Sequence, residues 1–124
     1  MNLVDSSGWI EYIQGGPNAD FFSPAITDRR QLIVPSICIF EVYRVLLRMA
    51  GASFADDAAT NMMQGNVVEL SPDLAIDAAQ TAHQHKLAMA DAIILATAWQ
   101  FDAVLWTQDK DLANFTDVKF KAKH

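Results

Sequence analysis

Short apolar runs alternate along this chain with longer stretches that have the spacing of helices. Five runs predict strands, at residues 2–6, 31–35, 67–70, 103–107 and 118–120. Their near-continuous apolar character is typical of strands that are buried on both faces of a parallel sheet. The helical stretches between them predict crossover connections. We therefore expect an α/β fold, a three-layer sandwich around a mostly parallel sheet of about four to five strands.

The predicted helices have recognisable ends. Ser71, Pro72 and Asp73 combine an N-cap serine, a first-turn proline and an acid that favours the helix dipole. Ser53 and Asp56 resemble a capping box, and Ser36 is predicted to cap the helix that follows it. The predicted helices cover residues 8–14, 20–26, 36–49, 53–64, 71–85 and 90–101, with a helical turn at 111–115.

The length and composition indicate one domain over residues 1–124. No stretch approaches the roughly 20 apolar residues that a membrane helix needs. A core strand is expected to start at once, so we expect no signal peptide and a cytoplasmic protein. The formal charge of −6 disfavours broad electrostatic capture of nucleic acid. It does not exclude a nuclease, because a bound divalent ion would reverse the local field.

Four acidic residues stand where predicted strands and helices meet. Asp5 closes the first strand, Glu41 interrupts an apolar helix, Asp91 heads another, and Asp109 follows the strand at 103–107. An ionised carboxylate among buried aliphatic side chains costs several kcal/mol unless it is paired or bound to a metal. Four such positions indicate a shared cation.

The topology of a parallel sheet is expected to bring these acids together. Ligand sites in such sheets lie beyond the carboxyl ends of the strands, and crossover helices begin at the same edge. Ser6 and Thr107 would add hydroxyl groups there. Carboxylates without His or Cys favour Mg²⁺ or Mn²⁺ over zinc. These ions activate water and neutralise charge on a phosphodiester.

The surroundings of the four acids resemble those of a known family. The segments that carry the resemblance are Val4-Asp5-Ser6-Ser7, Val34-Pro35-Ser36 leading into Phe40-Glu41, Leu87-Ala88-Met89-Ala90-Asp91-Ala92 and Thr107-Gln108-Asp109. Together, in this order, they are similar to the PIN-domain ribonucleases, and most of all to the small toxins of VapC type. The resemblance covers essentially the whole chain.

This resemblance implies Mg²⁺- or Mn²⁺-dependent endoribonuclease activity that inhibits translation. It assigns Asp5, Glu41, Asp91 and Asp109 to catalysis and metal binding, and Ser6 and Thr107 to supporting hydrogen bonds. It also implies an RNA substrate, a homodimer and a cognate antitoxin that blocks the active groove. Gln108 departs from the pattern, since many relatives carry Arg or Asn there.

Ordinary structural explanations compete with these assignments. Asp5 or Asp91 alone would serve as a helix-start acid, and Glu41 would pair with Arg44 or Arg48. Three further features stay open. Asp111 is either an N-cap or an outer metal ligand; Lys119, Lys121 and Lys123 protect an edge strand or contact RNA; and Phe54, Met49, Met62 and Met63 pack in the core or line a partner groove.

Two other functions fit an α/β fold with an acidic rim. A phosphotransfer or phosphohydrolase domain would want a second acid two residues after Asp5, where Ser7 stands, or a lysine at the end of a late strand. A non-catalytic binding module would keep the fold alone. All four acids are present, which favours the nuclease.

Overall fold

A five-stranded, fully parallel sheet forms the centre of the molecule in the computed structural model, which describes all 124 residues. The sheet has the order β3-β2-β1-β4-β5. Its strands are β1 (Asn2–Val4), β2 (Leu32–Pro35), β3 (Asn66–Val68), β4 (Val104–Thr107) and β5 (Val118–Phe120). The predicted α/β class and the central parallel sheet are confirmed.

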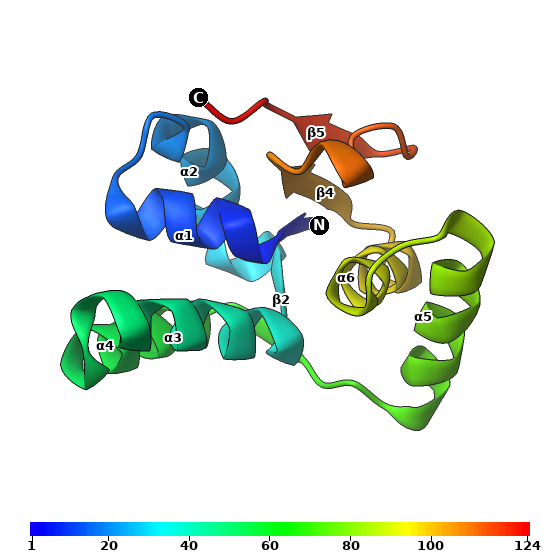
Figure 1. Ribbon diagram of the computed structural model, residues 1–124, viewed down its shortest axis with the longest axis horizontal. Helices are drawn as coiled ribbons and strands as arrows, with labels where there is room; N and C mark the ends of the chain where they lie inside the picture. The colour runs from blue at the N-terminus through cyan, green and yellow to red at the C-terminus, as the bar shows by residue number, and fades with distance from the viewer.

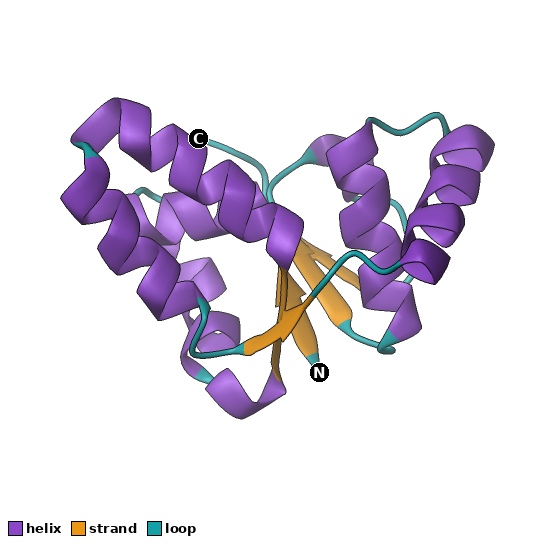
Figure 2. Cartoon of the chain, turned by 90° about the horizontal axis from the view of Figure 1, so that it is seen from below, coloured by secondary structure: helices purple, strands orange, loops and turns teal.

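Helices cover both faces of this sheet (Figures 1 and 2). One face carries α1 (Ser6–Gln14), α2 (Ala19–Thr27), α3 (Ser36–Ala50) and α4 (Ala52–Met62), and the other carries α5 (Pro72–His85) and α6 (Met89–Gln100). Two short 3₁₀ turns, η1 (Arg29–Gln31) and η2 (Lys110–Leu112), precede β2 and follow β4. The arrangement is the predicted three-layer sandwich. None of the helices is both long enough and apolar enough to span a membrane.

The strand residues are buried, as expected for a parallel sheet that helices cover on both faces. Every residue of β2 is buried, as are Leu3 and Val4 of β1. Each fully buried aliphatic side chain contributes about 1.5–3 kcal/mol relative to exposure. Gly8 lets α1 lie close to this core, because a Cβ there would come within 2.7 Å of atoms of Phe22 and Val4. The close approach fixes the junction between β1 and α1, where Asp5 lies.

The helix ends match the sequence patterns at one position and depart from them at three. Ser71 caps α5 as predicted, since its Oγ accepts a hydrogen bond from the Leu74 amide at 3.1 Å. Ser36 is instead the first residue of α3, and the N-cap, Pro35, makes no side-chain capping bond. The predicted role of Asp111 as an N-cap is wrong. Asp109 caps η2 instead, and its carboxylate accepts a hydrogen bond from the Asp111 amide at 2.9 Å.

The predicted capping box in α4 is the third departure. This helix begins at Ala52, behind Gly51, and no side chain caps it. The Asp56 carboxylate instead accepts a hydrogen bond from the Tyr43 hydroxyl at 2.7 Å. Asp56, which the local pattern predicted to cap the start of α4, therefore binds a side chain of α3 instead.

The residues predicted either to pack in the core or to line a partner groove fall into two groups. Met62 is fully buried, so it packs in the core and cannot line a groove. Met49, Phe54 and Met63 are exposed on or directly after α3 and α4. Cys38 is fully buried, and burial raises the pKa of its thiol well above the ordinary value. A thiol held protonated in this way is an inert core residue.

Candidate metal centre

The acids lie at the carboxyl edge of the two central strands. β1 and β4 are parallel neighbours, and Leu3 pairs in register with Leu105. Asp5 directly follows β1, and Asp109 lies two residues beyond the end of β4. Asp91 is in the first turn of α6, which packs against β4. The topology therefore delivers carboxylates from three separate segments to one edge, as the sequence predicted.

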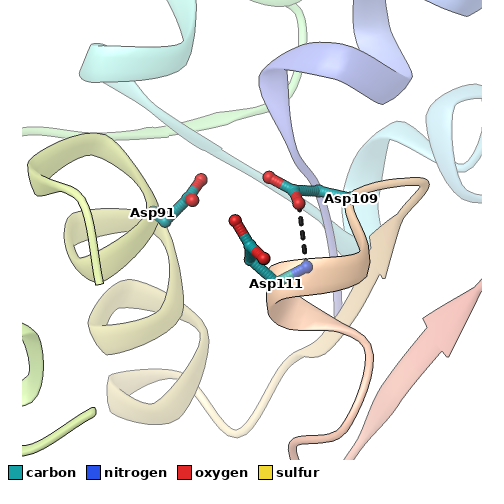
Figure 3. Close-up of side chains that lie close together, drawn as sticks. All are labelled: Asp91, Asp109 and Asp111. Atoms are coloured by element: carbon teal, nitrogen blue, oxygen red, sulfur yellow. Dashed lines mark hydrogen bonds between the residues drawn. The ribbon is translucent and has the colours of Figure 1, made fainter. Parts of the chain in front are cut away.

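Three carboxylates form the tightest group. Asp91 reaches from α6 toward Asp109 and Asp111, which lie in and beside η2 (Figure 3). Oxygen atoms of all three lie within 4.8 Å of one another. Oxygens that share a Mg²⁺ ion at about 2.0–2.1 Å stand roughly 3–4 Å apart, so a small contraction would suit the ion. The donor set fits a hard divalent cation. The group includes Asp111, for which an outer metal ligand was one of the two predicted roles.

Asp5 is held more deeply than the other acids. The residue is 3% exposed. It accepts hydrogen bonds from the Gly8 amide at 2.8 Å, from the Thr107 hydroxyl at 2.5 Å and from the Ser7 hydroxyl at 3.0 Å. The first of these makes Asp5 the N-cap of α1. The ordinary role of a helix cap and a place at the acidic edge thus coincide in one residue.

Thr107 connects two of the acids. Its hydroxyl donates to Asp5 and accepts a hydrogen bond from the Asp109 backbone amide at 2.9 Å. The supporting position predicted for Thr107 is therefore seen as a bridge between Asp5 and the β4–η2 turn. Ser7 was not predicted as a partner, although its place two residues after Asp5 is the usual spacing for a local side-chain contact.

Glu41 lies at the other side of the β1–α1 junction. Its Oε1 accepts a hydrogen bond from the Ser6 hydroxyl at 2.6 Å, so Ser6 supports Glu41 rather than Asp5. Glu41 also lines a cleft of about 240 Å³ together with Phe40, Arg44, Val45 and Arg48. We call this the α3 cleft. Glu41 stands outside the closest carboxylate group, and both of its candidate arginine partners line the same opening.

Burial and mutual repulsion raise the pKa of Asp91 to about 6. Burial is the largest cause, followed by the negative charges of Asp109, Asp5, Asp111 and Glu41. Asp91 therefore interacts electrostatically with each of these four acids. A divalent cation would relieve both causes, because it replaces lost hydration and offsets the like charges.

The pKa of Asp5 is also raised, chiefly by burial. Hydrogen bonds from Thr107, Gly8 and Ser7 oppose this effect, and the charge of Asp109 adds to it. Donors arranged around Asp5 stabilise the ionised form, and its burial opposes that form. The hydrogen bonds therefore hold the Asp5 carboxylate in one orientation. A nearby cation would offset the cost of burying its negative charge.

We expect the contribution of Asp91 to the stability of the metal-free protein to fall as the pH rises from about 4 to about 6. Folded Asp91 binds its proton more tightly than the unfolded chain does, so stability falls through the window between pKa 3.8 and about 6 and is level above it. The measurement is the melting temperature in EDTA, compared with that of Asp91→Asn. The difference between the two proteins should widen across this window and shrink when Mg²⁺ is added. A difference that stays constant with pH would contradict the raised pKa.

The Gln108 side chain makes hydrogen bonds within the protein. It is 8% exposed, and its Oε1 accepts a hydrogen bond from Asn18 Nδ2 at 3.0 Å. Its Nε2 donates to the Ser7 carbonyl at 3.4 Å, a long hydrogen bond. The residue that departs from the family pattern thus links the α1–α2 loop to the segment that follows Asp5. Asn18, fully buried in that loop, gave no signal in the sequence.

Several solved structures share this fold. A chain in a toxin–antitoxin complex from Klebsiella pneumoniae has a TM-score of 0.81 at 24% identity, over 96% of each chain. VapC20 from Mycobacterium tuberculosis, described as a sarcin–ricin loop cleaving toxin, has a TM-score of 0.79 at 19% identity, over 96% of this chain and 99% of that one. VapBC2 from Rickettsia felis, bound to promoter DNA, gives 0.71 at 11%, over 98% and 97%.

At these identities the likeness establishes a common fold. A search of curated proteins finds no match. The model of one family, described as the PIN domain, matches residues 3–119 and so spans nearly the whole chain, including all four acids predicted from the sequence. This chain belongs to the PIN domain family.

Proposed function

We propose that this protein is a divalent-metal-dependent endoribonuclease and the toxin of a type II toxin–antitoxin pair. The observation that carries the proposal is the carboxylate group at the sheet edge, where oxygens of Asp91, Asp109 and Asp111 lie within 4.8 Å of one another. Membership of the PIN domain family supports it. So do two structures of the same fold, one from a toxin–antitoxin complex and one of a toxin that cleaves the sarcin–ricin loop.

The carboxylates are proposed to hold Mg²⁺ or Mn²⁺. Asp91 and Asp109 are the first ligands, and Asp111 joins them. Asp5 and Glu41 complete the anionic edge and would contact the ion through water, since Mg²⁺ usually keeps several waters. A bound ion there supplies Lewis acidity and an activated water for phosphodiester hydrolysis.

The neighbouring side chains act by positioning. Thr107 fixes the Asp5 carboxylate and the Asp109 backbone together, and Ser6 fixes Glu41. Such oriented partners matter because loss of an outer hydrogen bond typically lowers metal affinity or activity about 10–100-fold. The supporting roles proposed for Ser6 and Thr107 therefore rest on specific contacts.

The biological setting follows from the same proposal. Cleavage of RNA in the cytoplasm would inhibit translation, and a cognate antitoxin would hold the enzyme inactive. A homodimer is proposed as the free form. Exposed apolar side chains on α3 and α4, including Phe40, Leu47 and Met49, provide surface for such partners.

One alternative function survives the family assignment. A phosphotransfer domain is set aside, because the chain is a PIN domain and Ser7 is used to orient Asp5. A non-catalytic PIN module shares every structural feature except activity. Intact acids and their ordered hydrogen bonds favour the enzyme, and only a cleavage assay separates the two.

Purified protein is expected to cleave single-stranded RNA with Mg²⁺ or Mn²⁺ and to stop when EDTA is added. The reason is that the candidate site contains carboxylates and no other group suited to activate water. Readdition of Mn²⁺ in excess over chelator should restore cleavage. Undiminished cleavage in excess chelator would refute the metal mechanism, and no cleavage with any divalent ion would favour the non-catalytic module.

A further inference from the structure

A second cleft lies directly beside the carboxylates, between η2 and the C-terminal tail. Its volume is about 400 Å³, and its lining residues are Gln108, Asp109, Lys110, Phe120, Ala122 and Lys123. We call it the tail cleft. Asp109 belongs both to this lining and to the carboxylate group. A ligand in the tail cleft would therefore lie next to any group that reacts at the metal centre.

The wall of the tail cleft is held in place by long-range hydrogen bonds. The Lys121 amide donates to the Thr107 carbonyl at 3.1 Å, and Asn18 Nδ2 donates to the Ala122 carbonyl at 2.9 Å. The same Asn18 amide group donates to Gln108, which lines the cleft. These contacts hold the tail against β4 and the α1–α2 loop, so the wall of the cleft has a defined position in the fold.

The tail cleft is lined by two lysines and one acid, Asp109, whereas the protein as a whole is acidic. The chain has a net charge of −6, yet Lys110 and Lys123 face one cleft and are both exposed. Phe120 adds an aromatic side chain that is 39% exposed. Ammonium groups that track a phosphate backbone, together with an aromatic platform for a base, are what proteins use to bind single-stranded nucleic acid.

Neighbouring lysines in the same segment have different surroundings. The Lys119 ammonium lies 4.5 Å from the centre of the Trp106 ring, so it is engaged in a cation–π contact. Lys119 and Phe120 point to opposite faces of β5, as successive strand residues do. Lys121 is exposed and does not line the tail cleft. Only Lys110 and Lys123 are therefore placed to act on a ligand in the cleft.

We propose that the tail cleft binds one nucleotide of single-stranded RNA beside the phosphate that is cleaved. The base would stack on Phe120, and the flanking phosphates would contact Lys110 and Lys123. This inference rests on the proposed nuclease function and adds the place of the substrate. A basic protein segment is a poorer occupant, because the two lysines would repel it.

The test compares two lysines of one segment. Lys123→Gln and Lys121→Gln remove the same charge from the same tail, and only the first alters the cleft. Binding is measured by fluorescence anisotropy with a short, labelled, random-sequence single-stranded RNA in EDTA, so that binding is separated from cleavage. The Kd should rise severalfold for Lys123→Gln and for Lys110→Gln, and less than about twofold for Lys121→Gln. Each cleft lysine should also lower the slope of log Kd against log salt by about 0.7.

Phe120 provides an independent arm. Phe120→Ala should raise the Kd about five- to hundredfold, the range for loss of one stacked base, whereas Phe120→Trp should keep tight binding. In steady-state cleavage with Mg²⁺, Phe120→Ala should raise KM and leave kcat nearly unchanged, as should Lys110→Gln and Lys123→Gln. Circular dichroism checks that each variant is folded.

The outcomes separate this inference from the nuclease proposal. Equal weakening by Lys121→Gln and Lys123→Gln, with an unchanged salt slope, would overturn the tail cleft even if the protein cleaves RNA. Selective loss of binding in the cleft variants of a protein that never cleaves would support the cleft and overturn the nuclease. Wild-type protein that neither binds nor cleaves the RNA would overturn both.

Discussion

Asp91→Asn is expected to lower RNA cleavage by at least about a hundredfold while the fold stays intact. Loss of an outer hydrogen-bonding partner lowers the metal affinity or activity of a site roughly 10–100-fold. Asp91 is itself a proposed ligand, so its loss should lower activity by at least the upper value of that range. The amide removes a negative charge and a hard anionic donor, both of which Mg²⁺ needs. The same change should raise the melting temperature of the metal-free protein at neutral pH, because it removes a charge that burial destabilises and that the neighbouring carboxylates repel, the two causes of the raised pKa of Asp91.

A matched control separates the site from net charge. Asp77→Asn makes the same charge change on the exposed surface of α5 and should leave cleavage within about twofold of wild type, as surface changes usually do. Cleavage assays and calorimetric titration with Mn²⁺ provide the two measurements. Full activity of Asp91→Asn at saturating metal would remove Asp91 from the catalytic set.

Asp5→Asn should cause a comparable loss of cleavage with a different effect on stability. Asparagine caps a helix about as well as aspartate, so the hydrogen bond from the Gly8 amide can persist. The Thr107 hydroxyl donates to Asp5 and already accepts from the Asp109 amide, and an amide NH₂ in place of the Asp5 oxygen would leave that hydroxyl without its acceptor. Any stabilisation should therefore be smaller for Asp5→Asn than for Asp91→Asn.

The position of the acidic edge was predictable because it depends on topology. Parallel strands with helical crossovers must bring their carboxyl ends to one side, and the sequence located Asp5, Asp91 and Asp109 relative to those ends. The close placement of Asp111 needed the structure. Its backbone amide donates a hydrogen bond to the Asp109 carboxylate, which caps η2, and its own carboxylate lies close to that of Asp91. A sequence pattern fixes neither the start of a short 3₁₀ turn nor the direction of its side chains.

Local signals failed where distant residues compete for the same group. The capping-box pattern at Ser53 and Asp56 was sound as a local rule, but Tyr43 of the neighbouring helix binds the Asp56 carboxylate. The hydrogen bond between Asn18 and Gln108 spans 90 residues of sequence, and no local pattern around either residue predicts it. Such contacts decide the shape of the tail cleft, so its existence could not be derived from sequence periodicity.

The surface beside Glu41 gives physical grounds for an inhibitory partner. Phe40 is 58% exposed and lines the α3 cleft with Glu41. Leu47, Met49, Phe54 and Met63 are also exposed, on or directly after α3 and α4. A partner with apolar side chains and a basic end could cover this surface and reach the metal-free carboxylates. Arginine suits that role because its guanidinium binds carboxylates through two parallel hydrogen bonds.

We therefore expect the antitoxin to compete with metal. The candidate inhibitor is the cognate antitoxin, and its apparent inhibition constant should rise as Mg²⁺ increases, since both bind the same carboxylates. Phe54→Ser should weaken inhibition at least about tenfold, the loss of one well-packed apolar contact, while Ile76→Ser, an equally polar change at an exposed position of α5, should have little effect. Inhibition that is independent of Mg²⁺ and equally sensitive to both substitutions would place the antitoxin away from the acidic edge and sink the idea.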